Sequence, residues 1–375
     1  MKKIKIMSIF GTRPEAIKMA PVVKALEKDK AIESIVCVTA QHREMLDQVL
    51  DLFHITPDYD LNIMKSGQTL SDITCRILKG IEEVLIEAKP DMILVHGDTS
   101  TTFSASLAAF YQQIKVGHVE AGLRSGNKWS PFPEEMNRSL TGRLADLHFS
   151  PTQGNYANLI KENVSKDVIV ITGNTVIDAL LMAVKEDYTF DYEYLNKIDY
   201  VNNKTILLTA HRRENLGKPM EQIFQAMLDV LEHNQNVEII FPVHLNPKVR
   251  NLANQYFEDV ERVHLIEPLD YEPFVNLQAR VDIVLTDSGG IQEEAPSLGK
   301  PVLVMRTETE RPEAVDAGTV KIVGIETQAI FDATHQLLNS QDAYKSMANA
   351  VNPYGDGQAS QKIVEAIKSY FSNNK

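Results

Sequence analysis

Cysteine is scarce in this chain of 375 residues, which contains only Cys37 and Cys75. Two thiols cannot build a disulfide framework or a multi-cysteine zinc site. No His-x-x-x-His or Cys-x-x-Cys spacing occurs, so the sequence predicts no metal site. Cys37 lies in the apolar segment 35–38, which predicts a buried thiol.

Long hydrophobic runs are also missing. No run approaches the ~18 apolar residues that a membrane span needs. The N-terminal segment MKKIKIMSIF is basic and then apolar, as in a signal peptide. Lys5 interrupts it, and GTRPE follows where a small-residue cleavage site would be expected. We therefore expect a cytoplasmic protein that does not insert into a membrane.

The chain has no excess of positive charge. Lys and Arg total 38 against 51 Asp and Glu, which gives a net charge of -13. This balance disfavours a nucleic-acid partner or an anionic membrane surface. Hydrophobic residues make up 43% and charged residues 24%, as in soluble globular proteins. The length predicts two to three domains at about 150 residues each.

Two glycine-rich nucleotide signatures are missing. No Gly-x-Gly-x-x-Gly follows the first apolar run, and Pro301 stands where a P-loop would carry Ser or Thr. A nicotinamide site is therefore not visible, and we expect no cofactor.

Short, β-branched apolar runs alternate with longer helical patterns along the chain. This alternation predicts an α/β fold with parallel sheets, and about ten strands are more than one ordinary domain needs. The runs are residues 4–10, 35–39, 92–96, 116–120, 168–171, 205–209, 237–243, 263–266, 283–286 and 302–305. Helical patterns include residues 15–27, 70–86, 100–111 and 220–231.

We place the domain boundary at Gly173 and Asn174, which interrupt the pattern. The predicted parts are a Rossmann-like domain over residues 1–172 and a second over residues 173–355. Residues 356–375 are expected to carry a helix that packs back on the first domain. The polar segment 191–203 is interpreted as surface.

In the first domain, charged residues follow several predicted strands. Ligands of open α/β sheets gather at this end of the strands. Arg13 and Lys18 follow the first strand and could hold an anion, or belong to an ordinary turn. Asp98 and Glu120 follow two later strands and could be cleft carboxylates, although an Asp-Thr pair also caps helices. Glu134 precedes Arg138 by four residues, the spacing of a helical ion pair.

The second domain repeats this arrangement. His211, Arg212 and Arg213 follow a strand and suit a phosphate, although solvated surface charges are equally compatible. His244 follows the next strand, and Phe274 could be a core aromatic or stack on a base. The strongest local signal is the segment 287–290, Asp-Ser-Gly-Gly, where free backbone N–H groups could hold a diphosphate. Glu294 could accept ribose hydroxyls, and Arg311 could face the same cleft.

Ten segments spread over nearly the whole chain resemble one family, the non-hydrolysing UDP-N-acetylglucosamine 2-epimerases of bacteria. They are residues 10–16 (FGTRPEA), 40–43 (AQHR), 96–99 (HGDT), 117–124 (GHVEAGLR), 133–135 (PEE), 172–175 (TGNT), 211–214 (HRRE), 242–244 (PVH), 287–290 (DSGG) and 310–313 (ERPE). The resemblance implies a fold of the glycosyltransferase-B type, two Rossmann-like domains whose parallel sheets face a central cleft that holds UDP. It also implies a homodimer.

The activity implied is reversible epimerisation at C2 of UDP-N-acetylglucosamine to UDP-N-acetylmannosamine, in the service of surface-polysaccharide synthesis. The C2 proton is not next to a carbonyl, so the expected route eliminates UDP to a 2-acetamidoglucal. Protonation of C2 on the other face and return of UDP to C1 complete the inversion. Acid/base groups near C2 and a cationic cradle for UDP are required.

The resemblance assigns roles residue by residue. The catalytic set is Asp98, Glu120, Glu134 and His211. The UDP-binding set is Arg13, Lys18, Arg138, Phe274, Ser288, Gly289, Gly290, Glu294 and Arg311. A second, allosteric UDP-N-acetylglucosamine is implied at Gln41, His42, Gln68, Arg212 and His244. At Glu44 and Gly67, relatives with this feature carry Gln and Arg.

Three other functions remain open. A hydrolysing 2-epimerase would release UDP, and a retaining glycosyltransferase of the same fold would need an acceptor. A non-catalytic UDP-sugar sensor would bind without turnover.

Overall fold

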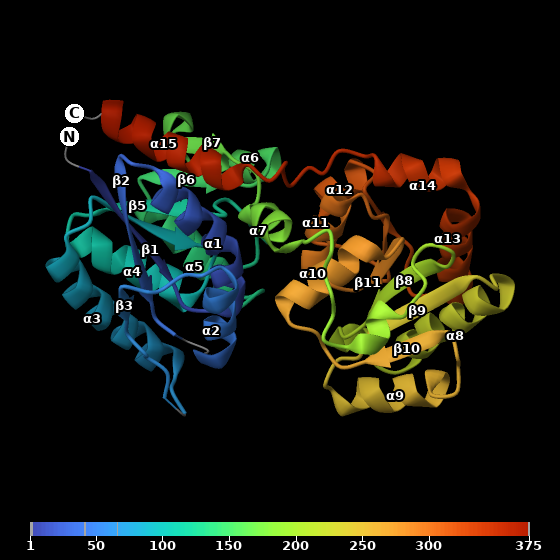
Figure 1. Cartoon of the computed structure of the whole chain (residues 1–375). Helices are drawn as coiled ribbons and strands as arrows, with labels where there is room; N and C mark the ends of the chain where they lie inside the picture. Colours follow the sequence, from blue (N-terminus) through green and yellow to red (C-terminus); the bar gives the residue numbers. More distant parts are fainter. Residues whose placement is uncertain (1–2, 41–42, 66, 374–375) are drawn as a thin grey trace. The chain divides into compact units, whose positions relative to one another are not determined.

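The computed structural model describes residues 3–40, 43–65 and 67–373. The chain forms two compact α/β units. The first comprises Met1–Met182 together with Tyr354–Lys375, and the second comprises Ala183–Pro353 (Figure 1).

The first unit is built on a seven-stranded sheet in the order β3-β2-β1-β4-β5-β6-β7. Every strand pair in it is parallel. The strands are β1 (Ile4–Phe10), β2 (Ile32–Val38), β3 (Tyr59–Asp60), β4 (Met92–His96), β5 (Lys115–Val119), β6 (Leu147–Ser150) and β7 (Ile169–Ile171). The strand order reverses between β1 and β4, which is where open α/β sheets bind ligands.

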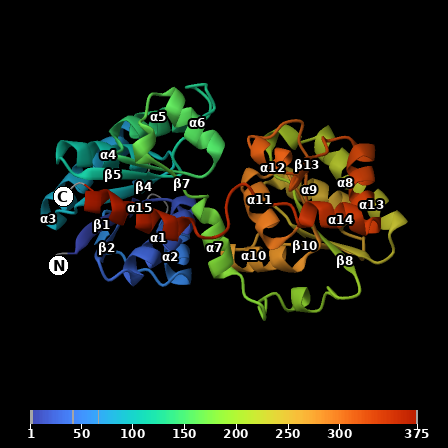
Figure 2. The same cartoon turned by 90° about the horizontal axis from the view of Figure 1, so that it is seen from above.

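Helices cover both faces of this sheet. They are α1 (Arg13–Lys28), α2 (Arg43–Leu52), α3 (Leu70–Ala88), α4 (Ser100–Tyr111), α5 (Glu134–Leu144), α6 (Gln153–Lys161), α7 (Thr175–Ala183) and α15 (Ala359–Asn373). Helix α1 packs with α2 and α15, and α4 packs with α3 and α5. Figure 2 shows these two groups on opposite faces. Burial on both faces explains why the strands are apolar without alternation.

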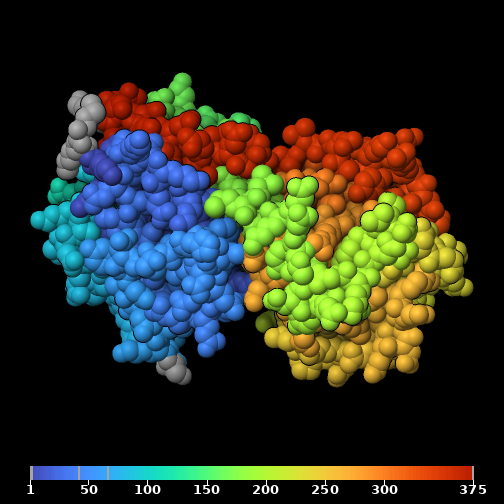
Figure 3. All heavy atoms as spheres, in the orientation of Figure 1, coloured from blue at the N-terminus to red at the C-terminus, as the bar shows by residue number. Residues whose placement is uncertain are grey.

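The last helix, α15, completes the first unit. Its Lys368 forms an ion pair with Asp29 at the end of α1, with Nζ 2.7 Å from Oδ2. The red C-terminal segment lies on the blue N-terminal residues in Figure 3. At its other end, the Asp178 carboxylate on α7 accepts the backbone N–H groups of Ala359 and Ser360.

The division between the units falls after Met182, later than the predicted boundary at residue 172. The reason is that α7 belongs with the first unit, because its Asp178 caps α15. Gly173 and Asn174 are therefore not the junction. They lie against Tyr354 and Gly355 within the first unit, where the Asn174 N–H donates to the Tyr354 carbonyl.

The second unit has a six-stranded parallel sheet in the order β10-β9-β8-β11-β12-β13. The strands are β8 (Lys204–Thr209), β9 (Val237–Pro242), β10 (Val263–Ile266), β11 (Ile283–Thr286), β12 (Val302–Val304) and β13 (Val320–Ile322). The helices are α8 (Lys218–His233), α9 (Pro247–Phe257), α10 (Tyr271–Arg280), α11 (Gly289–Glu294), α12 (Pro312–Asp316), α13 (Thr327–Asn339) and α14 (Gln341–Ala348). Its order reverses between β8 and β11, so the two units share one topology. The predicted α/β class with two Rossmann-like sheets is confirmed.

Three short strands, β3, β6 and β13, were not predicted from the sequence. Cys37 is buried as expected, and burial raises the pKa of its thiol to about 12. Among the described residues, no helix combines the length and the apolar character that a membrane crossing would require.

Candidate active site

Three adjacent strands of the first unit bring the predicted carboxylates to one edge. Strands β1, β4 and β5 are neighbours, so the segments that follow them meet at their carboxyl ends. Asp98 lies two residues beyond β4, and Glu120 follows β5 directly. Glu134 is the first residue of α5 and is half-buried. The sequence therefore located this edge of the sheet correctly.

Glu120 is held by partners from three different elements. Lys18 of α1 forms an ion pair with its Oε1, and Asn174 Nδ2 donates to the same oxygen over 3.1 Å. His96 Nε2 lies 3.6 Å from the other oxygen, Oε2. Glu120 itself has φ +62°, a left-handed conformation that is costly for a residue with a Cβ. Such a conformation persists only where the surroundings impose it, and it concentrates at functional sites.

Asp98 is paired with Arg138, whose Nη2 lies 2.8 Å from Oδ2. Burial raises the pKa of Asp98, Arg138 and Lys18 lower it, and Glu120 and Glu134 raise it further, with a net increase. Asp98 therefore lies within electrostatic range of two other carboxylates and two cations. An aspartate with a raised pKa can exchange a proton near neutral pH more easily than a free one.

Arg138 does not form the helical pair with Glu134 that its spacing suggested. The buried guanidinium contacts Asp98, and its Nε lies 3.6 Å from Glu135 Oε2. Glu135 also accepts the backbone N–H groups of Ser125 and Gly126 at 3.0 Å each. Glu134 and Arg138 thus form no i,i+4 ion pair, and Arg138 is held by Asp98 and Glu135 instead.

Glu15 is a buried carboxylate of this region that the sequence reading did not single out. It accepts hydrogen bonds from the Gly11 and Thr12 backbone and from the hydroxyls of Thr12, Thr99 and Thr102. These bonds tie the turn after β1, which carries half-buried Arg13, to the turn after β4, which carries Asp98. The signal available in the sequence was the Thr-x-x-Glu capping box at residues 12–15.

His96 and Asn174 are two further site residues that sequence reasoning missed. Burial lowers the pKa of His96 to about 4, so the ring beside Glu120 is neutral at pH 7. Asn174 was interpreted only as a break in the pattern. Both belong to segments already quoted for the family resemblance, which was the available signal.

In the second unit, Asp287 organises the segment that follows β8. Its buried Oδ2 accepts the backbone N–H groups of His211 and Arg212 at 2.8 Å each and Asn215 Nδ2 at 3.1 Å. Its Oδ1 lies 2.9 Å from His211 Nδ1. Strands β8 and β11 are neighbours at the point where the strand order reverses. His211 and the Asp-Ser-Gly-Gly segment are therefore brought together as predicted.

Two guanidinium groups converge on Gly289. A Cβ built at this glycine would lie 3.7 Å from Arg311 Cζ and 3.8 Å from Arg212 Nη2. Arg311 is oriented by an ion pair with Glu293, and Arg212 Nε donates to the Asp287 carbonyl over 3.2 Å. Two cations beside a short, glycine-bearing turn suit a diphosphate.

The remaining predicted UDP contacts belong to the same unit. Ser288 precedes α11 and is half-buried, and Gly290 is exposed. Glu294, in the last position of α11, lies 3.5 Å from Gln278 Nε2. Phe274 is half-buried on α10, so the structure does not enclose it in the core.

The residues predicted for a second nucleotide sugar are divided between the units. Arg212 adjoins Asp287, and the exposed His244 ring stacks on His211 with centroids 5.6 Å apart. Gln68 lies in the first unit, where its side chain bonds to the Ile63 carbonyl and the Lys65 N–H. Gln41 and His42 lie outside the described residues.

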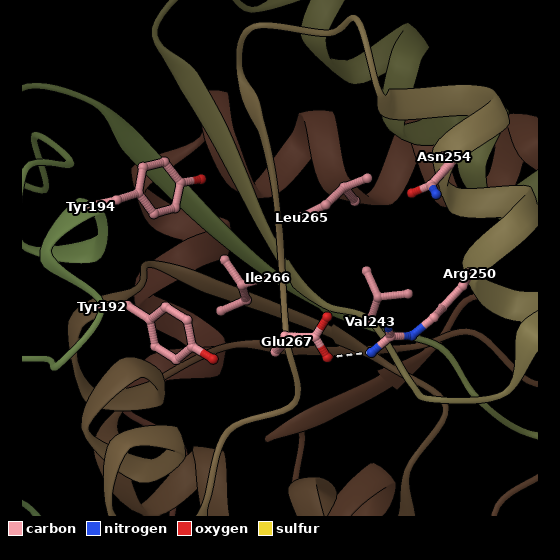
Figure 4. A pocket seen from close by; sticks show the side chains of 8 residues that line it. All are labelled: Tyr192, Tyr194, Val243, Arg250, Asn254, Leu265, Ile266 and Glu267. Carbon is pink, nitrogen blue, oxygen red and sulfur yellow. Dashed lines mark hydrogen bonds and ion pairs between the residues drawn. The ribbon is translucent and has the colours of Figure 1, made fainter.

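A separate hollow of about 570 Å³ opens at the carboxyl ends of β9 and β10 (Figure 4). Its lining residues are Tyr192, Tyr194, Val243, Arg250, Asn254, Leu265, Ile266 and Glu267. None of the predicted site residues lines it. Across residues 3–40, 43–65 and 67–373, no group of three or more His, Cys, Asp or Glu side chains is arranged to hold a metal ion.

Comparison with known proteins agrees with this picture. A family model described as UDP-N-acetylglucosamine 2-epimerase matches residues 24–368. The UDP-N-acetylglucosamine 2-epimerase of Bacillus subtilis (strain 168) is 57% identical over 375 residues, covering 100% of this chain and 98% of the relative. That of Escherichia coli (strain K12) is 56% identical, covering 98% of this chain and 99% of the relative.

A solved structure supports the same assignment. The crystal structure of the Neisseria meningitidis UDP-GlcNAc 2-epimerase bound to UDP-GlcNAc has a TM-score of 0.85 and is 53% identical. The match covers 98% of this chain and 100% of that one, and it confirms the glycosyltransferase-B type of fold. With a family model over most of the sequence and relatives at this identity, the chain belongs to the UDP-N-acetylglucosamine 2-epimerase family.

Proposed function

We propose that this protein interconverts UDP-N-acetylglucosamine and UDP-N-acetylmannosamine without releasing UDP. The observation that carries the proposal is the cluster of Asp98, Glu120 and Glu134 at the carboxyl ends of β4 and β5 and the start of α5. A glycosyltransferase has no evident use for Asp98 together with two further carboxylates that act on it. A 2-epimerase needs such groups, because inversion requires a proton to leave one face of C2 and another to arrive on the opposite face.

The proposed route is elimination followed by re-addition. One group of the cluster removes the C2 proton while the C1–O bond to UDP breaks, giving a 2-acetamidoglucal. A second group then protonates C2 on the other face, and UDP returns to C1. Burial raises the pKa of Asp98, which favours its protonated form relative to a free aspartate, and Glu120 is kept in place by Lys18 and Asn174.

Departing UDP needs positive charge and hydrogen-bond donors. In the second unit, Arg212 and Arg311 converge beside Gly289, and His211 adjoins the same turn. Fixed cations at developing negative charge lower the barrier without having to reorganise during the reaction. We assign the diphosphate to this cluster, with Ser288, Gly290, Glu294 and Phe274 as further contacts. Arg13, Lys18 and Arg138 are assigned to the substrate from the first unit.

Two further properties are proposed from the family resemblance. The first is a homodimer in the cytoplasm. The second is an additional UDP-N-acetylglucosamine bound at Gln41, His42, Gln68, Arg212 and His244, supported here by the His211–His244 stack. Replacing His244 with Ala should then flatten a sigmoidal dependence of rate on UDP-N-acetylglucosamine. A wild-type rate curve that is hyperbolic throughout contradicts the second site.

The deciding experiment incubates the protein with UDP-N-acetylglucosamine alone and separates the products. Reversible formation of UDP-N-acetylmannosamine without free UDP is expected. Stoichiometric release of UDP with free N-acetylmannosamine indicates a hydrolysing enzyme. Turnover only after an acceptor is added indicates a transferase, and binding without turnover indicates a sensor.

A further inference from the structure

The second unit contains a histidine–aspartate pair, His211 and Asp287, in which the aspartate has no role in the proposed mechanism. Asp287 follows β11 directly and its side chain is fully buried, with 0% exposure. His211 lies two residues beyond β8 and is 37% exposed, so one edge of the ring faces solvent. The distance from His211 Nδ1 to Asp287 Oδ1 is 2.9 Å.

The surroundings of Asp287 require an ionised carboxylate. Its Oδ2 accepts three N–H donors, two from the backbone of His211 and Arg212 and one from Asn215. Burial raises the pKa of Asp287, but the His211 ring and these backbone donors outweigh it and the pKa is lowered. An ionised carboxylate has no proton to donate. At 2.9 Å from Oδ1, an unprotonated Nδ1 would set its lone pair against that of the carboxylate, although the pair is not aligned as a hydrogen bond. A proton on Nδ1 removes this repulsion.

The position of the ring is fixed from a second direction. His244, which follows β9, stacks on His211 at 5.6 Å with an interplanar angle of 21°. The neighbouring charged groups are Arg212 on the same segment and Arg311, whose guanidinium approaches Gly289. Contacts with Asp287 on one side and His244 on another restrict the orientation of the ring.

We propose that Asp287 is a positioning residue that keeps a proton on His211 Nδ1 and so reserves Nε2 for the diphosphate. The assignment of the diphosphate rests on the proposed function, whereas the protonation pattern does not. When the C1–O bond breaks, its electron pair goes to the departing β-phosphate oxygen, which takes the Nε2 proton of the imidazolium. When that oxygen attacks C1 again, the proton returns to Nε2.

The variant Asp287→Asn tests this arrangement. The amide oxygen can occupy the Oδ2 position and keep the three N–H donors, while the amide NH₂ faces His211. Because an amide NH₂ donates, Nδ1 must now accept, and the proton of the neutral ring moves to Nε2. The tautomer should therefore reverse while the fold is retained.

The measurement is a long-range ¹H–¹⁵N correlation spectrum of histidine-labelled protein across the titration range. His211→Gln identifies the His211 signals among the 10 histidines. The neutral ring should carry its proton on Nδ1 in the wild type and on Nε2 in Asp287→Asn. A matched control is Asp282→Asn, at the other end of β11, where the carboxylate accepts the Thr205 N–H over 2.8 Å. This control should leave the His211 spectrum unchanged.

Kinetics give a second readout. In Asp287→Asn, kcat should fall about 100-fold or more, the usual loss for a general acid, because a neutral ring gives up its Nε2 proton less readily than an imidazolium. KM should change little, because Nε2–H can still donate to the diphosphate. The melting temperature should remain near that of Asp282→Asn.

The outcomes separate this inference from the proposed function. If the neutral His211 ring of the wild type carries its proton on Nε2, the inference is overturned, even if Asp287→Asn fails to fold. An unchanged tautomer or an unchanged kcat in the variant also overturns it. If the tautomer reverses but the wild type converts no UDP-sugar, the positioning role stands and the proposed function is wrong.

Discussion

Asp98, Glu120 and Glu134 are held in different ways, although all three belong to one cluster. Asp98 is paired with Arg138, and Glu120 contacts Lys18, Asn174 and His96. Glu134 opens α5 and acts on Asp98 through charge alone. These differences suit distinct roles as acid and base, since neighbouring charges and burial set the proton affinity of each carboxylate.

At the residue scale, changing any one of these carboxylates to its amide should reduce kcat by at least about 100-fold, the low end for acid/base groups. Affinity for UDP, measured by calorimetry, should change little, because the amide keeps the shape of the side chain. Glu33→Gln, at a half-exposed carboxylate on β2, is the control and should retain full activity. Near-normal turnover in all three amide variants would assign these residues to structure only.

Three buried histidines predict how the stability of the protein depends on pH. Burial lowers the pKa of His96 to about 4, of His118 to about 3 and of His148 to about 4. These folded-state values lie below the ordinary value of about 6.5, so the folded state favours the neutral rings. Their contribution is complete above pH 6.5 and is lost as the pH falls from there towards 4 and 3.

The free energy of unfolding in urea should therefore be lower at pH 5 than at pH 7.5. His148→Asn should reduce this difference, because the unfolded variant binds one proton fewer. His54→Asn, at an exposed position, should leave it unchanged. Equal pH dependence in both variants would show that His148 binds its proton equally well in the folded and unfolded states.

At the scale of elements, Gly122, three residues beyond β5, packs against α6. Its φ is +93°, and an added Cβ would lie 2.3 Å from the Asn155 carbonyl oxygen. Gly318 has a similar φ of +75° and nothing within 4 Å of that position. A left-handed conformation alone costs a residue with a Cβ about 1–2 kcal/mol.

Gly122→Ala should therefore destabilise its unit by clearly more than Gly318→Ala destabilises the other. The comparison is made by chemical denaturation followed by circular dichroism. Equal losses would mean that α6 moves away from Gly122 at little cost.

The elements that the sequence predicted well are long and apolar, and those it missed have a physical reason. Helix α4 was predicted with its observed bounds, because its N-cap Thr99 and its apolar residues are both local signals. Strand β6 was missed because His148 and Ser150 alternate with its apolar residues, yet all of its residues are buried. Strand β3 has only two residues and is defined by its pairing with β2, which no local pattern reveals.

Site residues were predictable when they follow a strong strand, as Asp98 and Glu120 do. The pairing of Glu120 with Lys18, His96 and Asn174 was not predictable, although Lys18 itself was among the predicted residues, because these contacts depend on the topology of the sheet. The Glu134–Arg138 spacing was misleading for the same reason: a neighbour in space, Asp98, competes with the neighbour along the helix.

At the scale of the whole molecule, the proposed elimination predicts that solvent deuterium is incorporated into the product. In deuterated water, C2 of UDP-N-acetylmannosamine should carry deuterium, since the proton that leaves and the proton that arrives use different groups. Mass spectrometry or NMR of the product measures this directly. Full retention of the original hydrogen at C2 would contradict the two-group mechanism but not the family assignment.

We also expect turnover to be independent of metal ions and of added nicotinamide. The reason is that elimination needs only proton transfer and leaving-group stabilisation, which side chains can supply. Dialysis against EDTA should leave kcat unchanged. Loss of activity that a divalent ion restores would require a different chemical route.

The placement of α15 has a consequence for the order in which the protein can be assembled during synthesis. The first unit is discontinuous, because Tyr354–Lys375 completes it, whereas the second is one continuous stretch, Ala183–Pro353. On a ribosome, the second sheet can thus finish folding while the first still lacks its closing helix. Until Asp178 and Asp29 receive that helix, the face of α1 that it covers stays open to chaperones and proteases.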